Sequence, residues 1–315
     1  AQAADAGLEQ LLEWRRAHLQ QGLQERLGIL RRRPPRGQAA KRAADREHVH
    51  QLRTGLRRLR SMAEAFPRHW RGPSTRHLAK LARAAGTVRD LDVLLEALEQ
   101  QHPGLAGDER QKLRRLIRQL ESCRAKARRK LRRRLQRLPG RLLAPPPHQV
   151  PTGDPAQVRH AFHRAALPLL RASLIRQLAN LRLHPGWGHG ERPKPNSRQE
   201  RDRHELRKSF KRFRYQLELL EALEPDLRDR LLILKQTQTS LGLLQDLVIW
   251  RDLLKHQLKG KLRRQLPHLS ARWRHQADGA WADWLQLRRR WLDPAEGLEA
   301  WQRGLLDLEL ERPAG

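Results

Sequence analysis

The chain has 315 residues, and its 66 Lys and Arg outnumber its 34 Asp and Glu to give a formal net charge of +32. Aromatic residues make up 4%, and the single cysteine, Cys123, excludes a disulfide framework within the chain. The abundant Leu, Ala, Arg, Glu and Gln are helix formers, so the composition favours an all-α protein. An excess of positive charge this large indicates a polyanionic partner, although a general arginine enrichment would account for part of it.

Apolar periodicity predicts helices over residues 8–32, 45–66, 108–138, 198–223, 225–257, 259–277, 279–292 and 295–310. One or two more helices are expected within 74–101, around Gly86. Helices resume near residue 156. The proline-rich stretch 141–155 predicts a connector between an N-terminal half (1–140) and a C-terminal half (156–310), followed by a tail (311–315). No run of 18 apolar residues occurs, so we expect no membrane-spanning segment. The shared helix face of Trp281, Trp284 and Trp291 indicates core positions.

An internal repeat relates the two halves. The segment HVHQLRTGLRRLRSMAEAF (48–66) aligns with DRHELRKSFKRFRYQLELL (202–220), and AGTVRDLDVLLEAL (85–98) aligns with LGLLQDLVIWRDLL (241–254). Two ordered matches at nearly equal separation indicate a duplication. We therefore predict two pseudo-symmetric helical-bundle halves, each with a basic helix followed by a helix that contains Gly-x-x-x-Asp.

Basic residues form one stripe on each repeated helix. At about 100° per residue, the first stripe is roughly 80° wide and borders the apolar face. Its members are His50, Arg53, Arg57 and Arg60, matched in the second half by His204, Arg207, Lys211 and Arg214, with Lys208 beside them. Like charges three and four residues apart repel, and an anion between them would relieve that repulsion. Arginine and lysine suit phosphate oxygens. Salt bridges to nearby acidic residues, at a junction between helices, are the alternative explanation.

The Gly-x-x-x-Asp helices carry residues that we interpret as structural. Asp90 and Asp246 would orient arginines or cap helices, with catalysis or metal binding as the alternative. Gly86 and Gly242 would allow close packing or a helix break. Neither glycine lies in a phosphate-binding loop motif.

At these blocks the sequence resembles the CHAD domain family, the conserved histidine α-helical domain. The resemblance rests on VHQLRTGLRRLR (49–60), GTVRDLDVLL (86–95) and HELRKSFKRFRYQLELL (204–220), and it extends over about residues 8–310. It implies two pseudo-symmetric halves around a basic central channel, which binds inorganic polyphosphate without catalysis. It also implies a cytoplasmic location, in association with polyphosphate granules.

The resemblance carries the expected polyphosphate-binding set onto His50, Arg53, Arg57, Arg60, Arg89, His204, Arg207, Lys208, Lys211 and Arg214. Gly86, Asp90, Tyr215, Gly242 and Asp246 match its motifs as structural residues, and Lys80, Arg83 and Lys235 are additional candidate contacts. Gln245 departs from the first-half pattern, where Arg89 stands. Arg58 and Arg212 project away from the stripes on a helical wheel, so we expect them to lie outside the site.

Weak, non-specific nucleic-acid binding is the alternative function. The segment 113–138 contains twelve Lys and Arg and could lie along DNA phosphates, or it could be a solvated outer face. No catalytic motif, metal-ligand cluster or cofactor motif is recognisable, so we expect neither an enzyme nor a bound cofactor. The oligomeric state cannot be predicted from these patterns.

Overall fold

The computed structural model describes residues 2–32, 39–105, 107–138, 155–188, 190–221, 227–259 and 261–306. Every regular element within these ranges is a helix, which confirms the predicted all-α class. Residues 141–154 of the predicted connector and the predicted tail lie outside the described residues. The elements are α1 (Gln2–Arg31), α2 (Ala39–Ala65), α3 (Thr75–Gln101), η1 (His102–Gly104), α4 (Gly107–Gln136), α5 (Pro155–Arg182), η3 (Pro185–Trp187), α6 (Arg198–Glu221), α7 (Leu227–Gln257), α8 (Leu262–Gln265), α9 (Pro267–Leu292) and α10 (Leu298–Leu306).

Three glycines lie inside continuous helices, although a helix break was one interpretation of Gly86 and Gly242 and was expected beside Gly279. Gly86 is within α3, Gly242 within α7, and Gly279 within α9, where the sequence suggested two separate helices. A glycine in a helix costs about 1 kcal/mol relative to alanine. Trp273 and Trp284 on α9 are buried on either side of Gly279, and burying one such side chain is worth roughly 2–3 kcal/mol. Packing therefore outweighs the glycine and keeps α9 unbroken.

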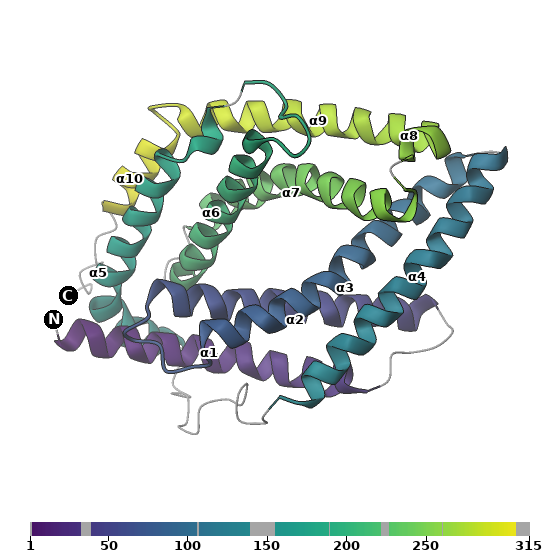
Figure 1. Cartoon of the computed structure of the whole chain (residues 1–315). Helices are drawn as coiled ribbons and strands as arrows, with labels where there is room; N and C mark the ends of the chain where they lie inside the picture. The colour runs from purple at the N-terminus through teal and green to yellow at the C-terminus, as the bar shows by residue number, and fades with distance from the viewer. Residues whose placement is uncertain are drawn as a thin grey trace.

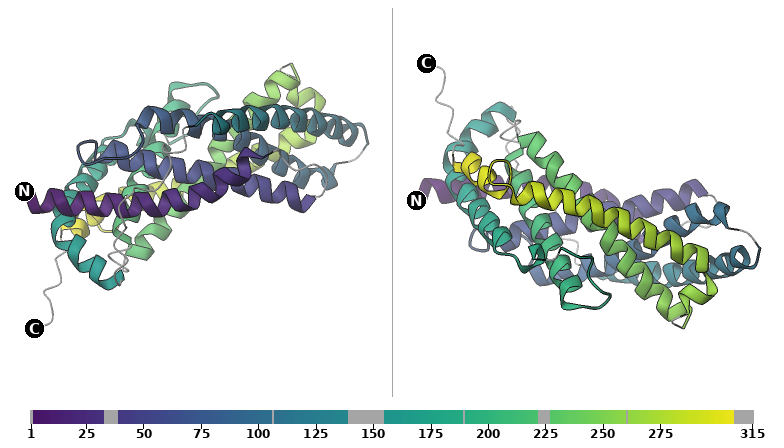
Figure 2. Two further views of the ribbon diagram at one scale, coloured as in Figure 1. Left: turned by 90° about the horizontal axis from the view of Figure 1, so that it is seen from below. Right: turned by 90° about the horizontal axis from the view of Figure 1, so that it is seen from above.

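The helices are arranged around the middle of the molecule. In Figure 1, α2, α3, α6 and α7 border this middle, while α1, α4, α5 and α9 form the outer sides. The two views of Figure 2 show α1 along one face and α9 along the opposite face. Helix α2 packs against α3, and α6 packs against α7. The two pairs meet where α2 contacts α6 and where α3 contacts α7. The helices that carry the repeated blocks therefore lie side by side, although duplication itself stays a prediction.

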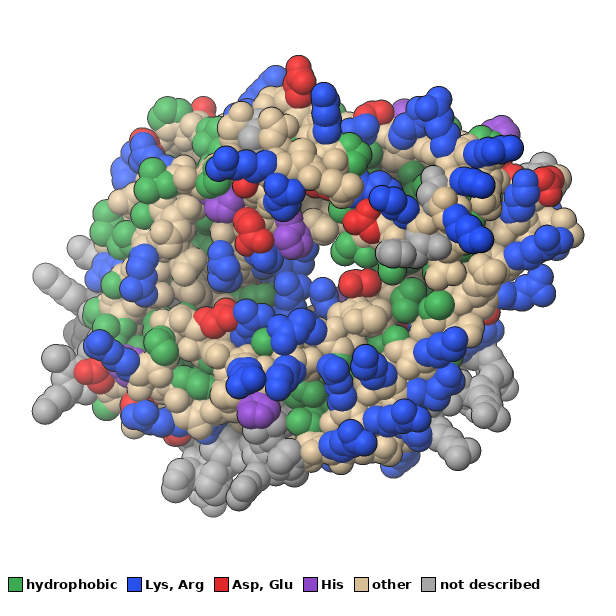
Figure 3. All heavy atoms as spheres, viewed as in Figure 1, with side chains coloured by type: hydrophobic (Ala, Val, Ile, Leu, Met, Phe, Trp, Pro, Cys, Tyr) green, Lys and Arg blue, Asp and Glu red, His purple; other side chains and the backbone are tan. Residues whose placement is uncertain are grey.

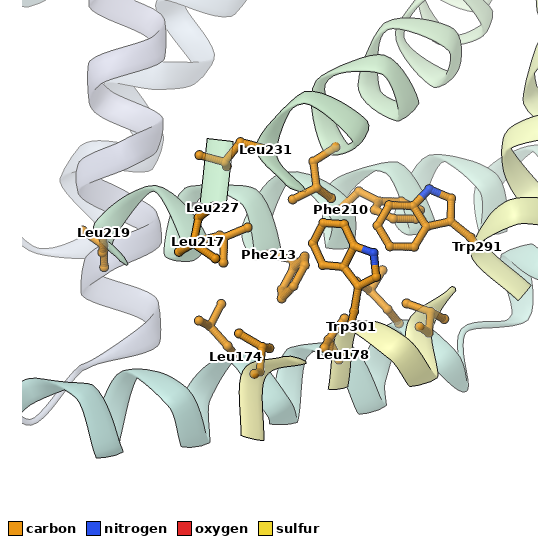
Figure 4. Close-up of a cluster of buried hydrophobic side chains, with 14 of the residues drawn as sticks. Leu174, Leu178, Phe210, Phe213, Leu217, Leu219, Leu227, Leu231, Trp291 and Trp301 are labelled. Carbon is orange, nitrogen blue, oxygen red and sulfur yellow. The ribbon is translucent and has the colours of Figure 1, made fainter. Parts of the chain in front are cut away.

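Three hydrophobic cores hold this arrangement within the described residues. One joins α1, α5, α6, α7, α9 and α10 with the end of α2, and Figure 4 shows part of it around Phe210, Phe213, Trp291 and Trp301. A second fills the space among α1, α2, α3 and α4, and a third joins α3 and α4 to α7 and α9. The burial of Trp281, Trp284 and Trp291 confirms their predicted place in the core.

The cores also fix the direction of the basic stripes. On α2, Leu52, Leu56 and Leu59 are fully buried, and on α6 Phe210 and Phe213 are fully buried. Because the stripes border these apolar faces, their cations are held at the edge of the core and not in open solvent. No helix in the described part of the chain is long and apolar enough to cross a membrane.

Candidate functional site

The structure brings the basic stripes of α2 and α6 together. Arg57 of α2 interacts electrostatically with Arg207 of α6, and Lys211 of α6 interacts with both Arg53 and Arg57. We call Arg53, Arg57, Arg207 and Lys211 the central basic cluster. Figure 3 shows an opening near the middle of one face of the molecule, with Lys and Arg side chains gathered at its margin.

Two carboxylates face this cluster from the neighbouring helices. Asp90 on α3 interacts with Arg53, Arg57 and Arg207, and Asp246 on α7 interacts with Arg207 and Lys211. Burial raises the pKa of both carboxyl groups. No ion pair of salt-bridge length joins either carboxylate to a cation among the described residues. The two carboxylates therefore offset the positive charge of the cluster only in part, by electrostatic interaction without a direct ion pair.

The central basic cluster carries uncompensated positive charge. Burial, together with the neighbouring cations, lowers the pKa of Lys211 to about 6 and that of Arg57 to about 10. Burial also lowers the pKa of Arg207, which is 9% exposed. The Nε of Arg207 is buried and has no hydrogen-bond acceptor in the described part of the chain. A bound oxyanion would supply both the missing negative charge and the missing acceptor.

Four other cations on α2 and α6 are paired with carboxylates. The pairs are Arg60 with Glu64 (2.7 Å), Lys208 with Glu205 (2.6 Å), Arg214 with Glu218 (3.4 Å) and Arg58 with Glu218 (3.0 Å). The salt-bridge explanation thus holds at these positions but not for the central basic cluster. Arg58 lies outside that cluster and uses its pairing with Glu218 to tie α2 to α6.

A small pocket lies at the junction of α2 and α6. Its wall combines Arg57, Arg60, Ser61 and Glu64 of α2 with Lys208, Lys211, Arg212 and Tyr215 of α6. Arg212, which projects away from the stripe on a helical wheel, thus lines this pocket, while its part in ligand binding stays untested. The flexible side chain of Arg212 reaches the pocket wall, and its Nη2 donates to Ser209 Oγ at 2.8 Å. A helical wheel predicts the direction in which a side chain leaves the helix, but not where the end of a long side chain lies.

Ser61 is a pocket residue that the sequence analysis missed. Its Oγ is buried and has no hydrogen-bond partner among the described residues. Ser61 lies one turn after Arg57, so its place on the same helix face as the stripe could have identified it.

Nearby, the guanidinium of Arg214 lies 5.0 Å from the ring centroid of Tyr215, a cation–π contact.

The two histidines occupy matched surroundings at the beginning of the stripes. His204 Nδ1 lies 2.6 Å from Gln245 Oε1 on α7. His50 lies near Arg89 of α3, the residue that aligns with Gln245 in the repeat. Burial lowers the pKa of both histidines, with Arg89 adding to the effect at His50 and Arg207 at His204. Because Gln245 stands where the first half has Arg89, His204 lacks the positively charged neighbour that His50 has.

The remaining candidates lie outside this junction. Lys80 and Arg83 on α3 and Lys235 on α7 are exposed, and none of them lines the pocket between α2 and α6. A Cβ added at Gly86 would lie 3.4 Å from Arg53 Nε, which is an ordinary contact, and one at Gly242 would meet no atom within 4 Å. The structure therefore gives neither position a steric need for glycine.

Arg203 extends the positive charge and was not found in the sequence. It is 5% exposed, lies one turn before Arg207 on α6, and interacts electrostatically with it. Burial lowers its pKa. The aligned residue in the first half is Val49, so a search for matched cations overlooks Arg203.

Two cations of the 113–138 segment point into the protein from α4, one buried and one partly buried. Arg128, 1% exposed, pairs with Asp45 at 2.9 Å, and Arg124 pairs with Asp45 at 2.8 Å and with Asp92 at 2.6 Å. Asp45 and Asp92 therefore join α2 and α3 to α4. Among the described residues, no three His, Cys, Asp or Glu side chains are grouped to hold a metal ion.

Comparison with known proteins identifies one family. The family model described as the CHAD domain matches residues 21–255. No match was found among the curated proteins. A solved structure, PptA from Streptomyces chartreusis, is similar over 89% of this chain and 98% of its own, with 15% sequence identity and a TM-score of 0.49. A likeness this distant carries no functional argument.

Proposed function

This chain belongs to the CHAD domain family, and we propose that it binds inorganic polyphosphate at the central basic cluster without catalysing a reaction. Family membership supports a function related to polyphosphate. The observation that carries the proposal is the charge imbalance between α2 and α6. There, Arg53, Arg57, Arg207 and Lys211 have no salt-bridge partner in the described part of the chain, and Lys211 has a pKa of about 6.

The chemistry of polyphosphate suits this site. Each internal phosphate carries one negative charge and exposes two oxygens, and the chain has no base or apolar group to recognise. Arg53 and Arg57 would contact phosphates from α2, while Arg207 and Lys211 would contact them from α6. The guanidinium forks provide paired donors, and the unmet Nε of Arg207 would gain an acceptor. Ser61 Oγ would add a neutral donor at the pocket wall.

Repulsion within the empty site is part of the proposed mechanism. Bringing these four basic groups together lowers the pKa of Lys211 and destabilises the unliganded protein, and a polyanion converts the repulsion into attraction. The affinity should therefore depend on how many phosphates reach these side chains, and the thin single chain of polyphosphate can enter a small pocket that duplex DNA cannot. We further propose association with polyphosphate granules, where the ligand is concentrated.

Weak nucleic-acid binding is the second candidate, and the exposed face of α4 favours it. Exposed cations follow this helix over its length: Arg114, Arg115, Arg118, Lys126, Arg129, Lys130, Arg133 and Arg134. Such a face would contact phosphates without reading bases.

Competition between the two polyanions tests the proposal. A fluorescent long-chain polyphosphate is bound to the protein at about physiological salt, where the Debye length is about 8 Å. Unlabelled polyphosphate or duplex DNA is then added at equal phosphate concentration. We expect polyphosphate to compete far more strongly than DNA. Competition by DNA that is equal or stronger would contradict the proposal.

A further inference from the structure

A second cavity lies beside the central basic cluster and differs from it in chemistry. It has a volume of about 220 Å³ and is formed by α6, α7, α9 and the segment that precedes α6. Leu244, Leu247 and Val248 of α7, with Trp273 and Ala277 of α9, supply apolar wall. Polyphosphate has no apolar part and would gain nothing from these surfaces. The cavity therefore favours a ligand with an apolar body.

One wall residue has an unused hydrogen-bond donor. Trp273 is 6% exposed, and its Nε1–H is buried with no acceptor among the described residues. An unsatisfied buried donor costs about 1–3 kcal/mol. Its presence favours a ligand body that carries an acceptor atom, as a heteroaromatic ring does and an alkyl chain does not. Ser270 adds a hydroxyl to the same cavity.

The rest of the lining is strongly basic. Arg192, Arg203, Arg251 and Arg274 line the cavity against one carboxylate, Glu200. Arg192 pairs with Asp278 at 2.5 Å, and Arg251 lies 3.4 Å from Glu200 and 3.0 Å from Asp252.

The other two arginines in the lining form no salt bridge within the described part of the chain and could contact a ligand. Arg203 and Arg274 have no ion pair of salt-bridge length in the described part of the chain. Arg274 is exposed, whereas Arg203 is 5% exposed and interacts electrostatically with Arg207 of the central basic cluster. An anionic group on the ligand would therefore lie toward Arg203 and Arg274.

We propose that this cavity binds a nucleoside polyphosphate, with the base against Trp273 and the α7 leucines and the phosphates on Arg203 and Arg274. The base supplies acceptor atoms for Trp273 Nε1–H, and the arginines provide paired donors for phosphate oxygens. This site is separate from the proposed polyphosphate site, although Arg203 and Arg207 are one turn apart on α6. Nucleotide binding here does not depend on the polyphosphate proposal.

Isothermal titration calorimetry with three ligands tests the assignment, using the full chain with Arg53→Glu so that phosphate binding at the central basic cluster is weakened. ATP carries base and phosphates, adenosine carries the base alone, and tripolyphosphate carries the phosphates alone. We expect ATP to bind at least tenfold more tightly than either of the others. ATP that binds no better than tripolyphosphate would overturn the proposal, because the apolar wall would then contribute nothing.

Variants locate the bound nucleotide. Arg274→Glu should weaken ATP binding at least tenfold, whereas Arg289→Glu, the same change at an exposed position on α9, should leave it unchanged. Trp273→Phe keeps an aromatic ring without the N–H donor and should weaken binding roughly fivefold, the effect of one hydrogen bond. Arg53→Glu removes phosphate contacts in the central basic cluster only, so it should leave the tight ATP site intact. Loss of ATP binding in Arg53→Glu with full retention in Arg274→Glu would refute the assignment.

Discussion

Polyphosphate affinity should depend on pH through a single lysine. The pKa of Lys211 in the unliganded protein is about 6, because the amine is largely buried among Arg53, Arg57, Arg207 and Arg214. Asp246 also faces it from α7, and His50 faces it from α2. At pH 7 most of the protein thus holds a neutral amine at this position. Bound phosphates would favour the charged form, so binding should take up a proton.

The size of the effect follows from the two pKa values. If bound polyphosphate restores the pKa to its ordinary value near 10.5, the affinity should fall about tenfold per pH unit between pH 7 and 9, or about a hundredfold in all. Internal phosphates stay ionised throughout this range, and the histidines, whose pKa values are lowered, are already neutral. Lys211 should therefore account for most of the change.

Fluorescence titration of labelled polyphosphate at pH 7, 8 and 9, at constant ionic strength, measures the slope. Lys211→Met should bind weakly and with almost no slope, and Lys211→Arg should bind tightly and with almost no slope. Lys208→Met removes a neighbouring lysine that pairs with Glu205, and it should keep the slope of the unmodified protein. Equal affinity at pH 7 and 9, or a slope that persists in Lys211→Met, would refute the reasoning.

Three other predictions concern stability and salt. The folded protein holds the Lys211 proton less tightly than the unfolded chain does, so without ligand the free energy of unfolding should rise from pH 7 to 9 by up to about 3 kcal/mol. Urea denaturation should show this rise in the unmodified protein and not in Lys211→Met. Asp45→Ala leaves Arg124 and Arg128 without their shared carboxylate and should cost about 3–5 kcal/mol by the same assay; a cost below 1 kcal/mol would show that the network is dispensable. Arg53→Glu should reduce the slope of log affinity against log salt by at least about one, and an unchanged slope would mean that Arg53 contacts no phosphate.

The local features of the fold were predictable because they depend on periodicity. The apolar positions Leu52, Leu56 and Leu59 repeat at helical spacing, and all three are buried. Their spacing also fixed the edge on which Arg53 and Arg57 lie. Periodicity says nothing about which helix faces a given edge, so the approach of α6 to α2 required the repeat and the family resemblance.

The errors came from side-chain reach and from tertiary packing. Arg212 starts away from the stripe but is long enough to reach the pocket wall. Arg128, which is buried, and Arg124, which is partly buried, looked like their exposed neighbours, although both continue the apolar spacing of Leu120, Leu131 and Leu135. Arg203 has no cation as its counterpart in the repeat, and only the structure shows that it is buried.

The location of polyphosphate binding is tested most directly by two matched double variants. Arg53→Glu with Arg207→Glu reverses two charges of the central basic cluster, and Arg129→Glu with Arg133→Glu reverses two exposed charges on α4. Hydrogen bonds to charged groups contribute about 1.5–3 kcal/mol each, so the first variant should bind polyphosphate more than a hundredfold more weakly. The second should bind nearly as well as the unmodified protein. Circular dichroism should show equal helix content in both. Undiminished binding by the first variant, with loss in the second, would place the ligand on α4 and contradict the proposed site.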